Sequence, residues 1–159
     1  MNVKNTLEYD VSNVKSCDFF EIIHLSFKEL KVENTFPLIK SYIFNMSGAN
    51  YGVVARSCGA DLSDSLIGFA FAHKANHDDT AYLSYIACNK SYRNNYVASN
   101  LLLELALQMS SDGLNCLKLN SFQNSTRFYE SLGFNNDCSN HYTISISDLI
   151  ENITMRLNK

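Results

Sequence analysis

The feature that most constrains the fold is an amphipathic repeat between residues 98 and 109. Its apolar side chains recur at the i, i+3, i+4, i+7, i+8 and i+11 spacing of one helix face, and they are Ala98, Leu101, Leu102, Leu105, Ala106 and Met109. This spacing predicts a long helix that ends at Gly113. Apolar runs at 81–88 and 116–119 predict a strand on either side of it. A strand, helix, strand unit of this length predicts parallel strands joined by a right-handed crossover.

The rest of the chain adds strands that favour antiparallel pairing. Runs at 51–57 and 66–74 are separated from each other and from 81–88 by short polar turns, which predicts a three-stranded meander. The other expected elements are a strand at 3–9, helices over 17–30 and 37–46, a short helix over 124–132 closing on Gly133, and late strands around Phe134, 141–147 and 153–157. At the first helix, Asp18 and Glu21 resemble a capping box. This order of elements predicts an α+β fold around one mixed sheet.

Composition narrows the class of protein. With 159 residues, 46% of them hydrophobic, the chain is long enough for a core, and we expect a single domain over 1–159. The formal charge of -3 argues against nucleic-acid binding, which needs a basic face. We find neither a secretory signal nor the roughly 20 apolar residues of a membrane span, so we expect a cytoplasmic protein without a membrane partner. The five cysteines never form a C-x-x-C pair, which predicts reduced thiols and no metal site.

The stretch from Leu83 to Leu103 predicts an anion site. It runs from an apolar strand through a polar turn, which carries Arg93, Asn94 and Asn95, into the amphipathic helix. The first N–H groups of a helix have no partner within the helix, and the helix dipole adds positive potential there. A turn that leads into a helix in this way suits a phosphate.

Two motifs resemble the GCN5-related N-acetyltransferase (GNAT) superfamily, and together they cover roughly residues 80–134. The family's acetyl-CoA turn is Arg or Gln, two residues, Gly, one residue, and Gly or Ala, and it stands here as RNNYVA (93–98). The family's later motif, Phe or Leu, Tyr, three residues, Gly, Phe, stands here as FYESLGF (128–134). The resemblance implies a mixed, mostly antiparallel sheet of six to seven strands flanked by four helices. It also implies acetyl-CoA as co-substrate.

The resemblance assigns roles to particular residues. It places the pantetheine arm against the strand before the turn and the pyrophosphate on the turn itself, which gives the cofactor-binding residues Ile86, Ala87, Cys88, Arg93, Asn94, Asn95, Tyr96, Val97, Ala98 and Ser99. At a further family position, where an asparagine is often found, Phe122 stands here, so a cofactor contact is expected from the flanking Asn120 or Asn124. A backbone N–H near Ile86 is expected to stabilise the oxyanion. Cys88 stands where the family has valine, so packing is favoured over an acyl-cysteine route.

Proton transfer is expected from hydroxyl groups. Tyr129 matches the family tyrosine that protonates the departing CoA thiolate. The family often supplies the general base at the positions of Tyr82 and Ser84, and these hydroxyls are expected to order water that removes the amine proton; an acidic residue from the first two helices is the alternative. Tyr96 departs from the family glycine, and it suits the cofactor only if its φ is negative and its ring points outward or lies along the cofactor.

The sequence leaves the acceptor open. We expect a small primary amine such as an amino acid, a polyamine or an amino sugar, acetylated by direct attack in a ternary complex. The alternatives are acetylation of a protein N-terminus or lysine, a non-catalytic acyl-CoA-binding module, and a plain α+β interaction domain; a homodimer is also left open. The group His73, His77, Asp78 and Asp79 is expected to lie in a solvated hairpin turn and to bind no metal.

Overall fold

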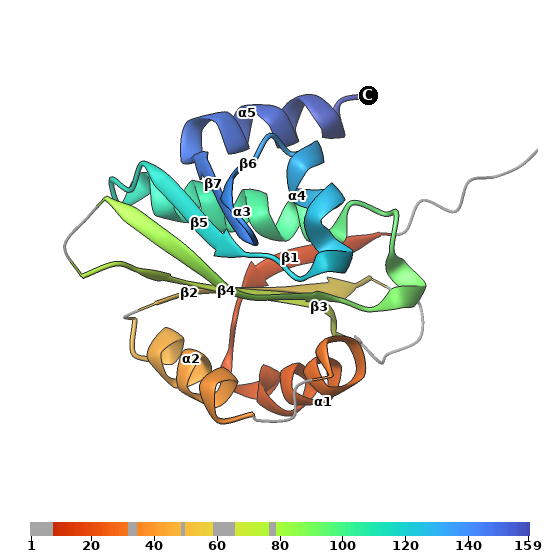
Figure 1. Cartoon of the computed structure of the whole chain (residues 1–159). Helices are drawn as coiled ribbons and strands as arrows, with labels where there is room; N and C mark the ends of the chain where they lie inside the picture. The colour runs from red at the N-terminus through yellow and green to blue at the C-terminus, as the bar shows by residue number, and fades with distance from the viewer. Residues whose placement is uncertain (1–7, 32–34, 49, 59–65, 77–78) are drawn as a thin grey trace, which may run out of the picture.

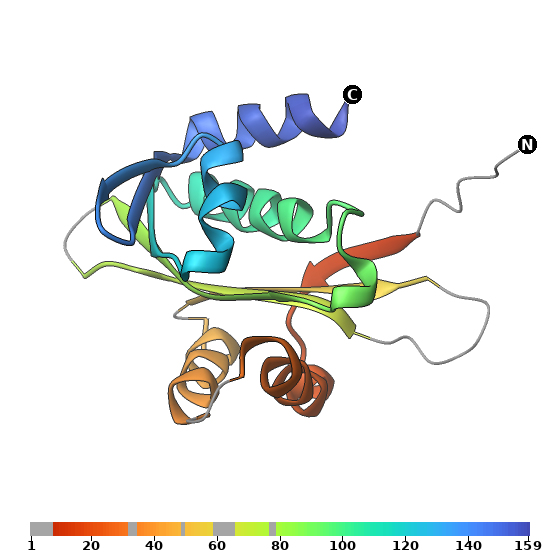
Figure 2. The same ribbon diagram turned by 45° about the vertical axis from the view of Figure 1, so that its right-hand side comes forward.

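The computed structural model describes residues 8–31, 35–48, 50–58, 66–76 and 79–159, and these form three layers (Figure 1). The strands are β1 (Tyr9–Asn13), β2 (Asn50–Ser57), β3 (Leu66–Lys74), β4 (Thr80–Cys88), β5 (Cys116–Asn120), β6 (Asn135–Cys138) and β7 (His141–Ser145). The helices are α1 (Phe19–Leu30), α2 (Phe36–Met46), α3 (Val97–Ser111), α4 (Thr126–Ser131) and α5 (Ile146–Leu157). Helices α1 and α2 cover one face of the sheet, and α3, α4 and α5 lie on the other (Figure 2).

The seven described strands follow the order β1-β2-β3-β4-β5-β7-β6. Within this sheet, β4 and β5 pair in parallel and every other neighbouring pair is antiparallel. The meander β2-β3-β4 and the parallel pair β4–β5 joined through α3 are both confirmed. The α+β class with a mixed, mostly antiparallel sheet is therefore confirmed, with one α-helix more than the four expected.

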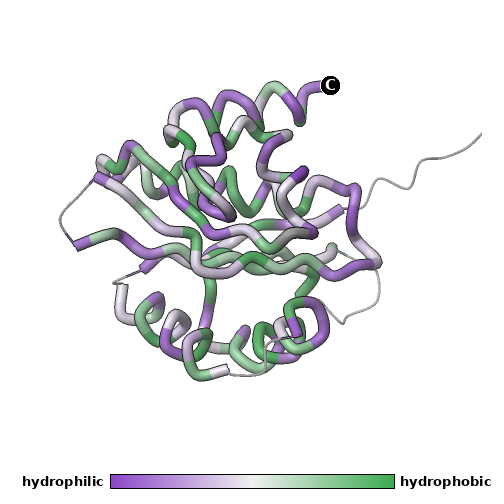
Figure 3. Tube along the Cα trace, viewed as in Figure 1, coloured by the Kyte–Doolittle hydropathy of each residue, from purple (hydrophilic) through white to green (hydrophobic). Residues whose placement is uncertain are grey.

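Two apolar clusters hold the layers together. On one face the predicted stripe of α3, including Leu101, Leu105 and Met109, is fully buried against the sheet. On the other face Phe69 and Phe71 of β3 are fully buried in the cluster that α1 and α2 cover. Strand β3 is buried on both faces from Leu66 to Ala72, and Figure 3 shows how hydrophobic the central strands are. Burial of this apolar surface is the main force that fixes α1 and α2 on the sheet.

The expected strand at 153–157 is wrong, because these residues belong to α5. The side chain of Ser145 caps the helix by accepting a hydrogen bond from the backbone N–H of Asp148 at 3.1 Å. The buried side chains of α5 follow the i, i+3, i+7 spacing of a helix, and they are Ile146, Leu149 and Ile153. Alternation over five residues resembled a strand, whereas the helical period emerges only over the full length of α5. The expected strand at 3–9 lies mostly outside the described residues, and β1 begins at Tyr9.

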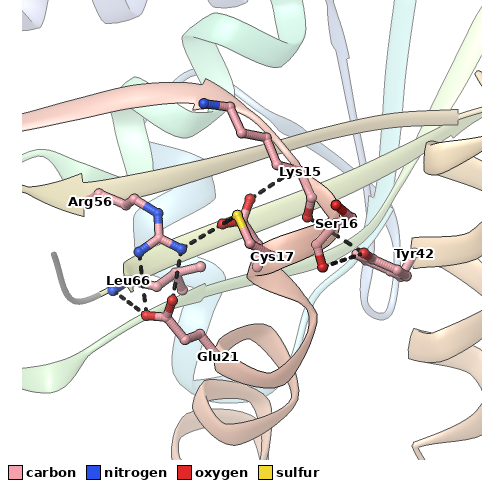
Figure 4. Close-up of polar contacts among 8 residues, drawn as sticks. Lys15, Ser16, Cys17, Glu21, Tyr42, Arg56 and Leu66 are labelled. Atoms are coloured by element: carbon pink, nitrogen blue, oxygen red, sulfur yellow. Dashed lines mark hydrogen bonds and ion pairs between the residues drawn. The ribbon is translucent and has the colours of Figure 1, made fainter. Parts of the chain in front are cut away.

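The expected capping box at Asp18 and Glu21 is also wrong, because Asp18 makes no side-chain cap and both carboxylates bind Arg56 of β2. Figure 4 shows the contact of Glu21 with Arg56. Nη2 of Arg56 lies 2.5 Å from Oδ1 of Asp18 and 2.8 Å from Oε1 of Glu21. Glu21 Oε2 also accepts the backbone N–H of Leu66 at 3.0 Å, and Asp18 accepts that of Lys15 at 2.7 Å. This network ties the start of α1 to β2 and β3, and so places the helix layer on the sheet.

Substituting Arg56→Met is expected to lower the free energy of unfolding by about 3 kcal/mol, because the Asp18 carboxylate would remain buried without a counter-charge. The side chain of Asp18 is only 1% exposed, whereas that of Glu21 is 42% exposed and contributes little. Urea unfolding measures the change. The double variant Asp18→Asn/Arg56→Met should recover part of the loss, since it removes the buried charge; a loss as large as that of the single variant would contradict this account.

Candidate active site

An open cleft of about 1100 Å³ lies where β4 and β5 separate. Along the described strands, their pairing runs from Thr80 with Cys116 to Tyr82 with Lys118 and goes no further. The part of β4 beyond Tyr82 therefore presents backbone groups toward the cleft. The expected site residues that this cleft brings together are Tyr82, Ser84, Ile86, Asn120 and Tyr129. Asn124 is exposed and does not line it.

A bulge in β4 shapes the cleft wall. Phe71 pairs with Tyr85 and Ala72 pairs with Leu83, so Ser84 is an extra residue that pairs with no residue of β3. A bulge re-aims a side chain and interrupts the ladder. Here the Ser84 hydroxyl lies 2.8 Å from Nδ1 of His73 in β3.

The structure corrects the expectation for His73. It lies inside β3 and not in a solvated turn, and its ring stacks on that of Tyr82 with the ring centroids 5.6 Å apart. Burial lowers the pKa of His73 below its ordinary value of 6.5, so the imidazole is neutral at neutral pH and can accept a proton. Asp79 is exposed and lies immediately before β4, and His77 and Asp78 lie outside the described residues. The described residues contain no cluster suited to a metal ion.

The two-residue alternation of β3 already indicates which face of the sheet His73 lies on, although the sequence analysis placed it in a turn. His73 follows Phe69 and Phe71 at two-residue spacing, so it shares their face of the sheet. The backbone register then pairs His73 directly with Tyr82. Cross-strand neighbours of this kind are within contact distance.

Tyr129 faces the cleft from α4. It is 5% exposed and packs its ring edge-on against Phe128 and Phe134. Burial raises the pKa of Tyr129, so the phenol keeps its proton throughout the neutral range. The C-terminal turn of α4 closes at Gly133, whose φ of 91° lies in the left-handed region, and an added Cβ there would lie 2.5 Å from the side-chain nitrogen of Asn152. The glycine of the motif is therefore required by geometry.

The turn before α3 has the features of an anion site. No hydrogen bond within the described chain occupies the backbone N–H groups of Tyr96, Val97, Ala98 and Ser99. The turn is held from outside, because the hydroxyl of Tyr9 in β1 donates to the carbonyl of Asn95 at 3.1 Å. Free N–H groups at the start of a helix are suited to phosphate oxygens.

Tyr96 does not meet the condition set from the sequence, because its φ is 59°. The neighbouring Asn94, at φ 66°, is also left-handed, a conformation that asparagine tolerates better than tyrosine. The Tyr96 ring does point outward: the residue is 47% exposed, and the guanidinium of Arg156 in α5 lies 5.8 Å from the ring centroid. The position therefore keeps the backbone conformation typical of glycine while carrying a large side chain.

Tyr96→Gly should be more stable than Tyr96→Ala by about 1 kcal/mol, because both variants lose the ring but only alanine retains the cost of a left-handed Cβ. Thermal or urea unfolding of the two variants measures the difference. Ala98→Gly is the matched control within α3, and there glycine should reduce stability. Equal stability of the two Tyr96 variants would mean that the turn relaxes and carries no strain.

Arg93 lies next to a carboxylate. Its Nη2 lies 3.6 Å from Oε2 of Glu29 in α1, while the side chain of Arg93 is 57% exposed. The side chain of Glu29 is 2% exposed and accepts the backbone N–H of Lys90 at 3.3 Å. The guanidinium is thus held near the turn by α1, with most of its surface open to solvent.

Ala87 and Cys88, the other expected cofactor contacts on β4, differ in what their side chains can do. The Ala87 side chain packs into the cluster beneath α1 and α2, so only its backbone can reach a ligand in the cleft. Burial raises the pKa of the Cys88 thiol to about 11, so Cys88 is protonated at neutral pH and is a poor nucleophile. All five cysteines are free thiols.

The chain belongs to the acetyltransferase (GNAT) family, whose model matches residues 17–134. An acetyltransferase of the GNAT family from Staphylococcus aureus Mu50 has a TM-score of 0.72 at 12% identity over 87% of this chain and 99% of that one. The PaiA N-acetyltransferase of Thermoplasma acidophilum, solved with coenzyme A, has a TM-score of 0.71 at 17% identity over 87% and 98%. The ribosomal-protein-S18-alanine N-acetyltransferase of Escherichia coli has a TM-score of 0.68 at 18% identity over 87% and 94%.

At these identities the structural similarities establish the fold alone. A search of curated proteins returned no match to the sequence. Within the described residues, no helix is both long and apolar enough to span a bilayer.

Proposed function

We propose that this chain is an acetyl-CoA-dependent N-acetyltransferase that acetylates the primary amine of a small molecule by direct attack in a ternary complex. One observation carries the proposal: a single cleft brings together an unpaired strand edge, the His73–Ser84 pair and the buried phenol of Tyr129. We place this activity in one domain over 1–159 and, because the cysteines are free thiols, in the cytoplasm.

The residues present fit acetyl-CoA. The unpaired edge of β4 near Ile86 can hydrogen-bond the amides of the pantetheine arm, as an added strand would. The free N–H groups at the start of α3 suit the pyrophosphate, and Arg93, whose guanidinium lies 3.6 Å from Glu29 in α1, precedes them in the same turn. A backbone N–H of the same strand edge would stabilise the negative charge that develops on the thioester oxygen.

The His73–Ser84 pair supplies a route for the amine proton. An alkylammonium group has a pKa of roughly 10.4 and must lose a proton before it can attack. Neutral His73 accepts that proton through the Ser84 hydroxyl, to which Nδ1 is hydrogen-bonded. The amine nitrogen then forms a bond to the acetyl carbon. The oxygen of Ser84 thus passes a proton on and forms no bond to carbon.

Tyr129 completes the transfer. When the bond between the acetyl carbon and sulfur breaks, its phenol donates a proton to the leaving thiolate, and the resulting phenolate regains a proton from the positively charged nitrogen that the amine attack has created, which becomes the neutral amide. Burial raises the pKa of Tyr129, so the phenol is protonated before the reaction, and Tyr129 lines the cleft. The net products are an acetamide, CoA and one proton.

Two measurements test the proposal. Calorimetry with acetyl-CoA tests cofactor binding, and release of free thiol over a panel of amines, protein N-termini and lysine peptides tests turnover. We expect micromolar to millimolar binding and thiol release with small amines. Binding without thiol release for any acceptor would instead identify a non-catalytic acyl-CoA-binding module, and absence of binding would overturn the proposal.

A further inference from the structure

The wall of the cleft has the opposite charge from the chain as a whole. The described wall of the cleft contains two lysines, Lys40 of α2 and Lys74 of β3, and no aspartate or glutamate. The whole chain, in contrast, has a formal charge of -3. A concave site lined by one sign of charge concentrates ligands of the other sign.

Exposed aromatic rings also line the cleft. Phe44 of α2 is 42% exposed and Phe122, after β5, is 80% exposed, and both line the cleft. Nζ of Lys40 lies 5.5 Å from the centroid of the Phe44 ring, so a cation and an apolar surface stand side by side. Binding sites commonly combine an apolar wall with a few polar groups that orient the ligand.

We propose that the acceptor is a primary amine that also carries an anionic group, a carboxylate or a phosphate, next to an apolar body. This inference rests on the proposed function and narrows its substrate class. Lys40 and Lys74 pair with the anion, and Phe44 and Phe122 cover the apolar body. The same lysines disfavour a second ammonium group, so polyamines are poor acceptors, and an amino sugar without an anionic group offers the lysines no partner.

The cationic wall also assists the chemistry. A nearby positive charge disfavours the protonated form of an amine and so lowers its pKa. A carboxylate in the cleft would have the reverse effect, because it would hold the ammonium form. The described wall therefore favours the neutral amine, which His73 can more readily produce.

Calorimetry on the protein loaded with CoA tests the inference by binding and does not depend on turnover. The ligands are L-phenylalanine, phenethylamine, which is the same amine without its carboxylate, O-phosphoethanolamine and spermidine. We expect L-phenylalanine to bind about ten-fold more tightly than phenethylamine, and spermidine more weakly than either. Tighter binding of O-phosphoethanolamine than of L-phenylalanine would identify the anion as a phosphate. Equal or tighter binding of phenethylamine or spermidine would overturn the inference.

Charge-neutralising variants identify the residues. Lys40→Gln and Lys74→Gln should reduce the affinity for L-phenylalanine and should not reduce that for phenethylamine, whose ammonium group the lysines repel. Lys28→Gln, on the exposed surface of α1, is the matched control and should change neither. Losses that are equal for both ligands would contradict an anion contact. Thiol release in the presence of spermidine but not of L-phenylalanine would refute the inference and leave the proposed function standing. Selective binding of L-phenylalanine without any thiol release would support the charge preference of the cleft and refute the proposed acetyl transfer.

Discussion

Tyr129→Phe is expected to lower kcat about 100-fold, because the thiolate would leave without a proton donor. The KM for acetyl-CoA should change little, since the ring itself remains in place among Phe128 and Phe134. Steady-state thiol release at saturating amine measures the effect. The loss should be in kcat because the hydroxyl acts only when the bond to sulfur breaks.

Tyr142→Phe is the matched control. Tyr142 is as buried as Tyr129, but its hydroxyl donates to Glu130 at 3.3 Å and does not line the cleft. Turnover of this variant should stay close to that of the unchanged protein. Full turnover of Tyr129→Phe would remove Tyr129 from the mechanism and leave it as a core aromatic.

His73→Gln is expected to lower kcat/KM for the amine about 100-fold near neutral pH, because it removes the proton acceptor. The deficit should shrink as the pH rises toward the pKa of the amine, since a growing fraction of acceptor arrives already deprotonated. In the unchanged protein, the rate should fall as the pH falls through the pKa of His73, which burial places below 6.5. A pH profile of kcat/KM for both proteins shows these changes.

Two controls separate a base from a structural residue. His141→Gln, at an exposed position that opens β7, should leave the profile unchanged. Ser84→Ala should reproduce the loss if the proton passes through the hydroxyl. A deficit of His73→Gln that stays constant at every pH would assign His73 to positioning Ser84 and Tyr82.

Much of the fold was predictable because it depends on local periodicity. The stripe of α3 and the runs of β2, β3 and β4 alternate with clear turn residues, and each element formed where expected. The wrong prediction of a strand at 153–157 has a local cause too, because five residues are too few to distinguish the alternation of a strand from the period of a helix. The end of α4 at Gly133 was predictable, because a glycine readily adopts the left-handed conformation that closes a helix.

The site depended on contacts between residues distant in sequence. A bulge in β4 places Ser84 against His73, and nothing in either strand alone specifies which register the ladder adopts. The left-handed Tyr96 contradicts the local preference of the residue, and the structure shows the turn held by Tyr9 from β1 and the guanidinium of Arg156 from α5 near the exposed ring. Short-range patterning thus specifies which segments become helices and strands. The contact of His73 with Ser84, the charge of the cleft wall and the left-handed turn at Tyr96 arise only where packing brings separate segments together, since each needs partners that no single segment contains.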